Sequence, residues 1–396
     1  MAGQHNRRLV PATVVLDGAR LYNIKKNLHG GNAELNTVLS RLVKQADRWL
    51  LEGPWSVTSK QQIPPSGDKH DYLSQAPYWW RSDTPDGMPY IRRDGKVNPE
   101  SLQCPDKTNK SKVFQSSYIL ALAWFYTGNK AYSIHAAEII RNWFLAPETR
   151  MNPNLDHAQI IPGANSGRAI GIIDFSQQYT GILDAAAILA SGAPGWSDAY
   201  VAAFRSWNRG YLNWLTHSPF GVEESLEENN HGTFAAMQKA GVSLFLGDID
   251  ATLKEVKILR ERISREISAD GSQPRELART RSWHYSCFNL VAFTRAACIA
   301  QKVGMDLWGC VGAEGQGVHT AVEFLLPYAT GSTSWPHPEL KFLAFAAYDV
   351  VIASAEAGSL QAVAIVDRLR KPPTEDDLWQ LRPAPEQLDD VKVKPS

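Results

Sequence analysis

The chain has 396 residues, and its 41 lysines and arginines balance its 41 aspartates and glutamates, so its formal net charge is zero. A neutral chain lacks the broad positive field that gathers nucleic acid or anionic membrane, and no apolar run is long enough to cross a bilayer. Four cysteines without CxxC spacing are too few for a disulfide scaffold and do not favour a zinc site. The polar residues 1–8 contain no apolar segment of a signal peptide.

Helical periodicity dominates the chain. Apolar residues recur at helix-face spacing over 35–50 and 253–267, and an aromatic stripe over 200–214 steps by three and four. Core packing explains this stripe better than a sugar-binding platform does. The same patterning predicts helices over 113–127, 130–145, 167–191, 232–246, 284–303, 316–329 and 340–357.

The order of the predicted elements indicates the fold class. Strand-like alternation is scarce, and helices of similar length follow one another with turn signals between them. We therefore predict an all-α fold, an α/α toroid or incomplete α/α barrel, as a single domain over residues 1–370. Residues 53–111 form a long loop-rich segment whose aromatic side chains argue against disorder, so we expect an ordered lid or cleft segment there. Residues 371–396 form a charged, proline-rich tail that we expect to pack loosely.

The first polar motif is Asn229-Asn230-His231, directly before the predicted helix over 232–246. Asparagine caps helices well, but capping accounts for one of these residues and not for all three. Two amides and a titratable ring need polar partners wherever they are buried. Asn229 fits a cap or a supporting role, and Asn230 and His231 are candidates for a functional site.

A second polar motif ends in a tyrosine. Arg279 precedes Tyr285 by six positions, and His284 adjoins it. An unperturbed tyrosine has a pKa of about 10, and a nearby guanidinium stabilises the phenolate and lowers that value. Tyr285 is thus a candidate general base, and His284 a candidate substrate contact. The alternative is a solvated arginine that happens to precede a core tyrosine.

Two further segments are candidates for binding an anionic substrate. Asn165 and Arg168 lie in a polar loop that we expect to enter a helix, whose N-terminus can bind a carboxylate. An ordinary capped helix start explains this segment equally well. Between residues 77 and 100, aromatic and arginine side chains could form a lid over an acidic sugar chain. The side chains concerned are Tyr78, Trp79, Trp80, Arg92 and Arg93.

Together these motifs resemble the alginate lyase domain superfamily. The likeness rests on the Pro-Tyr-Trp-Trp to Asn-Pro-Glu region over 77–100, on Asn229-Asn230-His231, and on Glu276-Leu-Ala-Arg279 with His284-Tyr285. The 77–100 motif and the spacing from Arg279 to Tyr285 are similar to polysaccharide lyase family thirty-eight. Family five is a more distant likeness, because its corresponding spacing is one residue longer. The resemblance implies an α/α toroid with a long cleft, in a family with alginate- and glucuronan-cleaving members.

The resemblance also implies a reaction, the β-elimination of a 1,4-linked polyuronate without a metal or other cofactor. It assigns Asn230, His231 and Arg279 to neutralising or orienting the substrate carboxylate, and Tyr285 to proton transfer. In mannuronate and glucuronate the C5 hydrogen and O4 lie on the same ring face, so Tyr285 alone can act as base and then acid. In guluronate they lie on opposite faces, and His231 would be the base and Tyr285 the acid. The expected substrate is therefore glucuronan or mannuronate-rich alginate.

Two other function classes are weighed against this one. An α/α-toroid glycoside hydrolase would use paired carboxylates, for which the candidates are Glu224, Glu228, Asp156 and Asp174. A non-catalytic polyuronate-binding protein would keep the fold without turnover. Because polymeric substrates lie outside cells, we expect secretion, and the sequence carries no signal for an oligomeric state.

Overall fold

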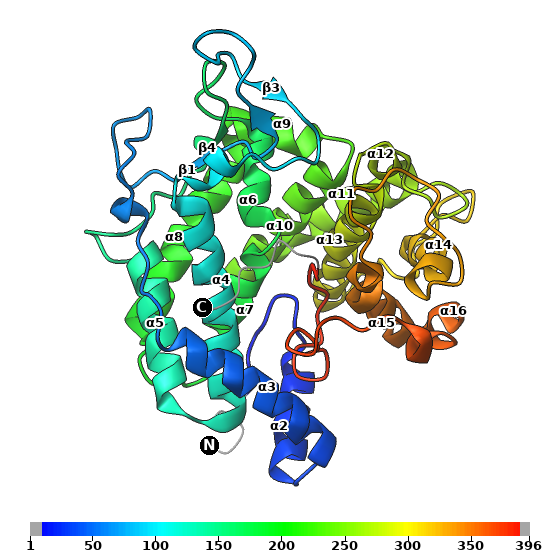
Figure 1. Cartoon of the computed structure of the whole chain (residues 1–396). Helices are drawn as coiled ribbons and strands as arrows, with labels where there is room; N and C mark the ends of the chain where they lie inside the picture. Colours follow the sequence, from blue (N-terminus) through cyan, green and yellow to red (C-terminus); the bar gives the residue numbers. More distant parts are fainter. Residues whose placement is uncertain (1–9, 389–396) are drawn as a thin grey trace. The chain divides into compact units, whose positions relative to one another are not determined.

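The computed structural model describes residues 10–388 and divides into two compact units. The first unit comprises residues 17–224 together with the described residues up to Thr13, and the second comprises Val14–Leu16 and residues 225–388. Both units consist mainly of α-helices (Figure 1). Among residues 10–388, no helix is both long enough and apolar enough to cross a membrane.

Helix α4 (Asp106–Thr127) lies in the interior of the first unit. It contacts α3, α5 and α7, and it buries residues on all its faces, as expected of a helix covered by neighbours. The other helices of this unit are α2 (Gly18–His29), α3 (Ala33–Trp49), α5 (Lys130–Phe144), α6 (Ile173–Ser176), α7 (Tyr179–Leu189), α8 (Asp198–His217) and most of α9 (Pro219–Leu226).

The aromatic stripe predicted over 200–214 lies on α8. Its members Phe204, Trp207 and Tyr211 are buried, and the Trp207 ring lies 4.7 Å from that of Phe144, edge to face. Tyr211 in turn contacts Tyr179 with ring centroids 5.4 Å apart. Because these aromatic edges and faces cover one another, the stripe forms core, and the core-packing interpretation is confirmed.

Four short strands order the loop-rich segment. β1 (Leu73–Gln75) pairs in parallel with β4 (His157–Ile160), and β2 (Trp79–Trp80) pairs antiparallel with β3 (Ile91–Arg92). The 3-10 helix η1 (Val57–Ser59) precedes β1 along the chain, and a second one, η2 (Pro99–Leu102), follows β3. Helix α4 begins at Asp106, so residues 106–111, expected in the loop, are helical.

In the second unit, helix α10 packs against α11 and α13, and α13 also contacts α12, α14 and α15 (Figure 1). Gly247 ends α10 with a φ of 77°, a left-handed conformation that favours glycine. Asp248 then caps α11 by accepting the N–H of Ala251 at 2.9 Å. The helices are α10 (Asn230–Leu246), α11 (Ile249–Glu266), α12 (Pro274–Leu277), α13 (Ser282–Lys302), α14 (Val318–Ala329), α15 (Tyr348–Glu356) and α16 (Leu360–Val363).

Two helix predictions are wrong in their boundaries. The helix predicted over 167–191 is broken into η3 (Ala169–Ile172), α6 and α7, because Arg168 is extended and its N–H donates to Ala158 O at 3.2 Å. The helix predicted over 340–357 starts only with η4 (Ala344–Ala347) and α15, since the residues before them bind the start of α13.

The C-terminal tail packs more closely than its composition suggests. Arg382 is buried and donates to Asp349 at 2.9 Å, and Trp379 and Leu381 are buried as well. Because Arg382 is paired with the carboxylate of Asp349, its charge can be buried in this polar segment. The expectation of loose packing is thus wrong for residues 371–388, and residues 389–396 lie outside the described part of the chain.

Candidate active site

Helix α10 begins at the Asn229-Asn230-His231 motif, and Asn229 is its N-cap. The side-chain oxygen of Asn229 accepts the backbone N–H of His231 at 2.9 Å, and its side-chain nitrogen donates to Glu227 at 3.2 Å. The capping interpretation of Asn229 is confirmed, and its amide is occupied at the helix start. His231 lies half-buried on the first turn of the helix.

Asn230 is fully buried and binds a carboxylate. Glu276, on the short helix α12, accepts the backbone N–H of Asn230 at 2.7 Å and its side-chain N–H at 2.8 Å. Burial raises the pKa of Glu276 to about 7, although the Asn230 hydrogen bonds and the charges of Arg279 and His231 act in the opposite direction. Asn230, His231 and Arg279, three of the predicted site residues, are therefore brought together around Glu276.

Arg279 and Tyr285 are in direct contact. A guanidinium nitrogen of Arg279 donates to the phenol oxygen of Tyr285 at 2.8 Å, and the guanidinium carbon lies 3.8 Å from the ring centroid. An N–H donated to a phenol oxygen stabilises the phenolate more than the neutral phenol. Tyr285 is 7% exposed, and the neighbouring His284 is also buried, with its ring stacked on Phe288. The predicted Arg–Tyr pair is thus present as a contact.

The helix that carries Glu276 is bound to the helix that carries Tyr285. Gln273, just before α12, donates its side-chain N–H to Ser286 O at 3.0 Å and accepts the side-chain N–H of Asn289 at 2.9 Å. Both partners lie on α13, one and four residues beyond Tyr285. These buried hydrogen bonds fix α12 against α13, and so they hold Glu276 at a fixed distance from Tyr285.

A buried arginine holds the backbone segment that precedes α10. Arg262 donates to the backbone oxygens of Ser225 and Glu227, both at 2.7 Å, and pairs with Glu266 at 2.5 Å. A Cβ at Gly232 would lie 2.0 Å from Glu227 O and 2.2 Å from an Arg262 nitrogen. The position after His231 is therefore restricted to glycine by a close approach of backbone and guanidinium.

In the first unit, two arginines lie over indole rings of the predicted lid segment. The Arg168 guanidinium lies 5.6 Å from the Trp79 ring, and that of Arg93 lies 5.4 Å from the Trp80 ring. Strand pairing places Trp79 opposite Arg92. Burial lowers the pKa of Arg168, and the charge of Arg92 lowers it further. We call Trp79, Trp80, Arg92, Arg93 and Arg168 the arginine–tryptophan surface.

The remaining predicted binding residues lie near this surface. Tyr78 is half-buried, and its backbone oxygen accepts the N–H of Arg93 at 2.7 Å. Asn165 is exposed, and its side-chain oxygen accepts the N–H of Ile161 at 3.2 Å, which closes a tight turn. The helix N-terminus expected after Asn165 is absent, because Arg168 is extended and only the 3-10 turn η3 follows it.

The strand that leads to the arginine–tryptophan surface is held by a buried ion pair. Lys60 donates to the backbone oxygens of Val57, Lys69 and Asp71 at 2.7 to 2.9 Å and pairs with Asp106 at 2.8 Å. Neither side chain of the ion pair is exposed to solvent. Burial raises the pKa of Asp106 to about 6, against the effect of the Lys60 charge.

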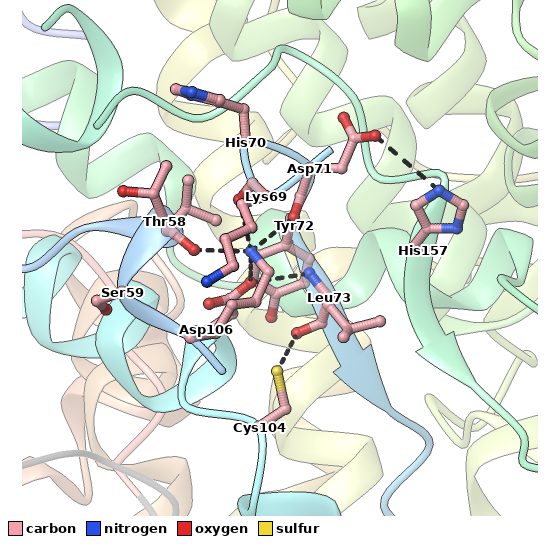
Figure 2. Close-up of polar contacts among 12 residues, drawn as sticks. Thr58, Ser59, Lys69, His70, Asp71, Tyr72, Leu73, Cys104, Asp106 and His157 are labelled. Carbon is pink, nitrogen blue, oxygen red and sulfur yellow. Dashed lines mark hydrogen bonds and ion pairs between the residues drawn. The ribbon is translucent and has the colours of Figure 1, made fainter. Parts of the chain in front are cut away.

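Figure 2 shows how Asp106 of this pair also binds the first residue of β1. Asp106 also accepts the backbone N–H of Leu73 at 3.0 Å, and the Cys104 thiol donates to Leu73 O at 3.1 Å. Asp71 lies 4.0 Å from a ring nitrogen of His157, at the start of β4. The first residue of β1 is thus bound on both its backbone groups, and the loop carrying Trp79 and Trp80 departs from a fixed point.

The carboxylates that a glycoside hydrolase would need have other partners. Asp174 is buried, accepts Tyr72 at 3.1 Å and Ser74 at 2.6 Å, and pairs with Lys107 at 3.3 Å. Asp156 accepts the indole N–H of Trp214 at 2.9 Å, and the exposed Glu228 pairs with Arg275. Glu224 is buried on α9. The structure gives Asp156, Asp174 and Glu228 structural or ion-pair partners.

The sequence motifs missed one residue of the site. Glu276 was part of the Glu-Leu-Ala-Arg motif, yet nothing in its spacing indicates that it binds Asn230. Within residues 10–388, no group of three or more His, Cys, Asp or Glu side chains is arranged to hold a metal ion. All four cysteines are free, and burial raises the pKa of Cys104 to about 11.

Comparisons with known proteins identify the family. The alginate lyase family model matches residues 56–335. An alginate lyase structure from Bacteroides ovatus is 30% identical, with 94% of this chain and 99% of that chain covered and a TM-score of 0.89. Alginate lyase A1-III from Sphingomonas species A1 is 15% identical, with 87% and 93% covered and a TM-score of 0.54. A variant of A1-III bound to a tetrasaccharide is 16% identical, with 88% and 94% covered and a TM-score of 0.56.

The comparison with curated protein sequences gives no significant match. The helical architecture and the matched family define an all-α polysaccharide lyase of the α/α-toroid fold class that acts on a polyuronate. The chain belongs to the alginate lyase family. The resemblance stated from the motifs, the predicted fold class and the predicted enzyme class are all confirmed.

Proposed function

We propose that the chain cleaves a 1,4-linked polyuronate, glucuronan or mannuronate-rich alginate, by β-elimination with Tyr285 as the proton-transfer group. The observation that supports this most directly is the Arg279 N–H donated to the Tyr285 oxygen at 2.8 Å. A phenol oxygen that accepts a guanidinium N–H can carry negative charge, and can therefore remove a proton from carbon.

The C5 proton of a uronate becomes acidic when the adjacent carboxylate is neutralised. Asn230, His231 and Arg279 are the proposed neutralising groups, and they supply amide, imidazole and guanidinium donors without recourse to a metal ion. Donors directed at a developing enediolate act like an oxyanion hole, and each is worth about 2.7–4 kcal/mol. Glu276 binds Asn230 through two hydrogen bonds, and Asn230, His231 and Arg279 all belong to the second unit.

The bond changes balance within one sugar linkage. Tyr285, as phenolate, takes the C5 proton, and the electron pair forms the C4–C5 double bond. The C4–O4 bond breaks, and the departing O4 takes the proton from the Tyr285 hydroxyl. The products are a new reducing end and an unsaturated uronate end, and Tyr285 returns to its starting state.

The stereochemistry of the substrate determines how many groups are needed. One tyrosine suffices when the C5 hydrogen and O4 share a ring face, as in mannuronate and glucuronate. Guluronate requires a group on each face, and His231 would then be the base and Tyr285 the acid. We propose the single-tyrosine substrates, because the Arg279 contact supports Tyr285 in both steps.

The arginine–tryptophan surface of the first unit is a proposed contact for uronate residues of a polysaccharide. Indole rings stack on the apolar faces of sugars, and guanidiniums pair with carboxylates in bidentate fashion. Arg168 over Trp79 and Arg93 over Trp80 combine both functions. Tyr78, Asn165, His284 and Asn229 are proposed as supporting contacts. Because such polymers lie outside cells, we also propose that the protein is secreted.

New ultraviolet absorbance from polymannuronate, polyguluronate, glucuronan and a glycosaminoglycan, assayed side by side, tests the reaction and its substrate. We expect absorbance from glucuronan or polymannuronate. Tyr285→Phe should abolish it while substrate affinity, measured by calorimetry, stays within about threefold. Turnover in the Tyr285→Phe variant, or absorbance from polyguluronate alone, would contradict the proposal.

A further inference from the structure

The amide of Asn230 has a fixed orientation in which only its nitrogen is hydrogen-bonded. Its nitrogen donates to Glu276, whereas its oxygen is buried and has no hydrogen-bond partner among the described residues. A buried polar atom without a partner costs about 1–3 kcal/mol, so the arrangement needs a compensating reason.

The carboxylate of Glu276 supplies that reason. Both of its oxygens accept hydrogens from Asn230, one from the backbone at 2.7 Å and one from the side chain at 2.8 Å. The reversed amide would place its oxygen against a carboxylate oxygen, which is repulsive. Glu276 therefore selects one of the two amide orientations, and it fixes the backbone at the first residue of α10 at the same time.

An amide nitrogen carries two hydrogens, and Glu276 uses one of them. We propose that Glu276 is a positioning residue of the elimination, which holds Asn230 so that its second N–H meets the carboxylate of the bound uronate. Asn230 is buried in this structure, so this contact requires that substrate binding uncover its side chain. This inference rests on the proposed role of Asn230 in carboxylate neutralisation. Glu276 acts through Asn230 and transfers no proton to or from the substrate.

The surroundings of Glu276 support a positioning role. It is 1% exposed, and the charged groups that bear on it are His231 from α10 and Arg279 from beyond α12. Gln273, three residues earlier, is bound to Ser286 and Asn289 on α13. The backbone that carries Glu276 is thus fixed to α13, the helix that carries Tyr285. Because Asn230 binds Glu276, its amide is held in a fixed position relative to α13 as well.

The test compares Glu276→Gln with the parent enzyme on the preferred polyuronate. Glutamine keeps the shape but offers one acceptor to two donors, so the Asn230 amide loses its fixed orientation. We expect kcat to fall by about ten- to a hundredfold with KM changed less than about threefold, because misplacement of about 1 Å costs this much in rate. Glu314→Gln, an exposed glutamate of the same unit, is the matched control and should leave both constants unchanged.

A double-variant cycle shows whether Glu276 acts through Asn230. In an Asn230→Ala background, Glu276→Gln should cause no further loss of kcat, since the group it positions is already absent. A further loss equal to that in the parent enzyme overturns the inference, as does an unchanged kcat in Glu276→Gln when Asn230→Ala is impaired. If Asn230→Ala itself keeps full activity, the proposed function of Asn230 fails instead.

A second variant covers the case in which Glu276→Gln does not fold. Asn230→Asp with Glu276→Gln exchanges amide and carboxylate, so that glutamine accepts the backbone N–H and donates to the new aspartate. This pair restores both hydrogen bonds, and we expect a folded protein by circular dichroism whose kcat is at least about a hundredfold below the parent. Parent-like activity in this exchanged pair overturns the inference.

Discussion

The carboxylate of Glu339 accepts the backbone N–H of His284 at 3.1 Å and so caps helix α13 from a loop 55 residues further along the chain. The helix has no capping side chain of its own, because Arg281 at its N-cap makes no such bond. Pro338 O accepts the N–H of Ser282 at 3.0 Å in the same loop. The first turn of α13, which carries Tyr285, is therefore completed by residues 338–339.

This cap predicts a joint loss of stability and activity. Glu339→Ala removes the acceptor for His284 and the partner of Arg281, and loss of a cap costs about 0.5–2 kcal/mol. We expect a lower unfolding midpoint in denaturant and a lower kcat, since Tyr285 lies one residue beyond His284. Glu314→Ala is the control, and equal effects of the two variants would contradict the capping role.

Arg279 should not be replaceable by lysine. Lysine keeps the charge but not the planar fork that lies 3.8 Å from the Tyr285 ring and donates to its oxygen. We expect Arg279→Lys to lower kcat/KM by about 10²–10³, the usual cost of one oxyanion donor. Initial rates from ultraviolet absorbance measure the loss, and full activity in this variant would exclude the proposed role of the Arg279 guanidinium.

The arginine–tryptophan surface should affect binding more than chemistry. Arg168→Ala removes a guanidinium that lies over Trp79, so we expect KM to rise by about fivefold or more with kcat nearly unchanged. The rise should shrink at high salt, because the lost contact is between charges. Arg209→Ala, an exposed arginine on α8, is the matched control, and a similar rise in KM there would mean a general charge effect.

Loss of Lys60 from the buried pair Lys60–Asp106 should strongly destabilise the first unit. Lys60→Met leaves Asp106 buried without its partner, and breaking a buried ion pair on one side costs about 3–5 kcal/mol. Lys60→Met with Asp106→Asn removes both charges and should recover part of the loss. Chemical unfolding of the three proteins measures the difference, and a single variant as stable as the parent would refute this role.

Glu276 predicts a pH dependence of stability. Burial raises its folded pKa to about 7 from an unfolded value near 4.5. As pH rises from about 4.5 to about 7 the unfolded chain releases this proton first, so the contribution of Glu276 to the free energy of unfolding falls over that window. The parent should thus lose stability relative to Glu276→Gln between these pH values. A constant difference between the two proteins across the window would show that the pKa is not raised.

The sequence allowed candidate catalytic side chains and the Arg279–Tyr285 contact to be predicted, but not the contact between Asn230 and Glu276. Asn229 was predictable as a cap because capping depends on a few neighbouring residues. Glu276 binds Asn230 from 46 positions away, between two helices, and no local pattern encodes that distance. The helix expected over 340–357 failed for a related reason, since residues 338–340 bind the start of α13 instead of continuing a helix. In both examples, hydrogen bonds between residues far apart in the sequence determine the structure, and local propensity does not predict them.

Asn230, His231, Glu276, Arg279 and Tyr285 all belong to the second unit, whereas the arginine–tryptophan surface belongs to the first. The proposed chemistry and the proposed polymer recognition therefore lie in two separate stretches of the sequence. We expect substitutions between residues 77 and 168 to change which polyuronates are bound without altering the proposed reacting groups. We expect natural diversity in substrate choice within this architecture to accumulate in the first stretch, and engineered libraries aimed at new polymers to be most productive there.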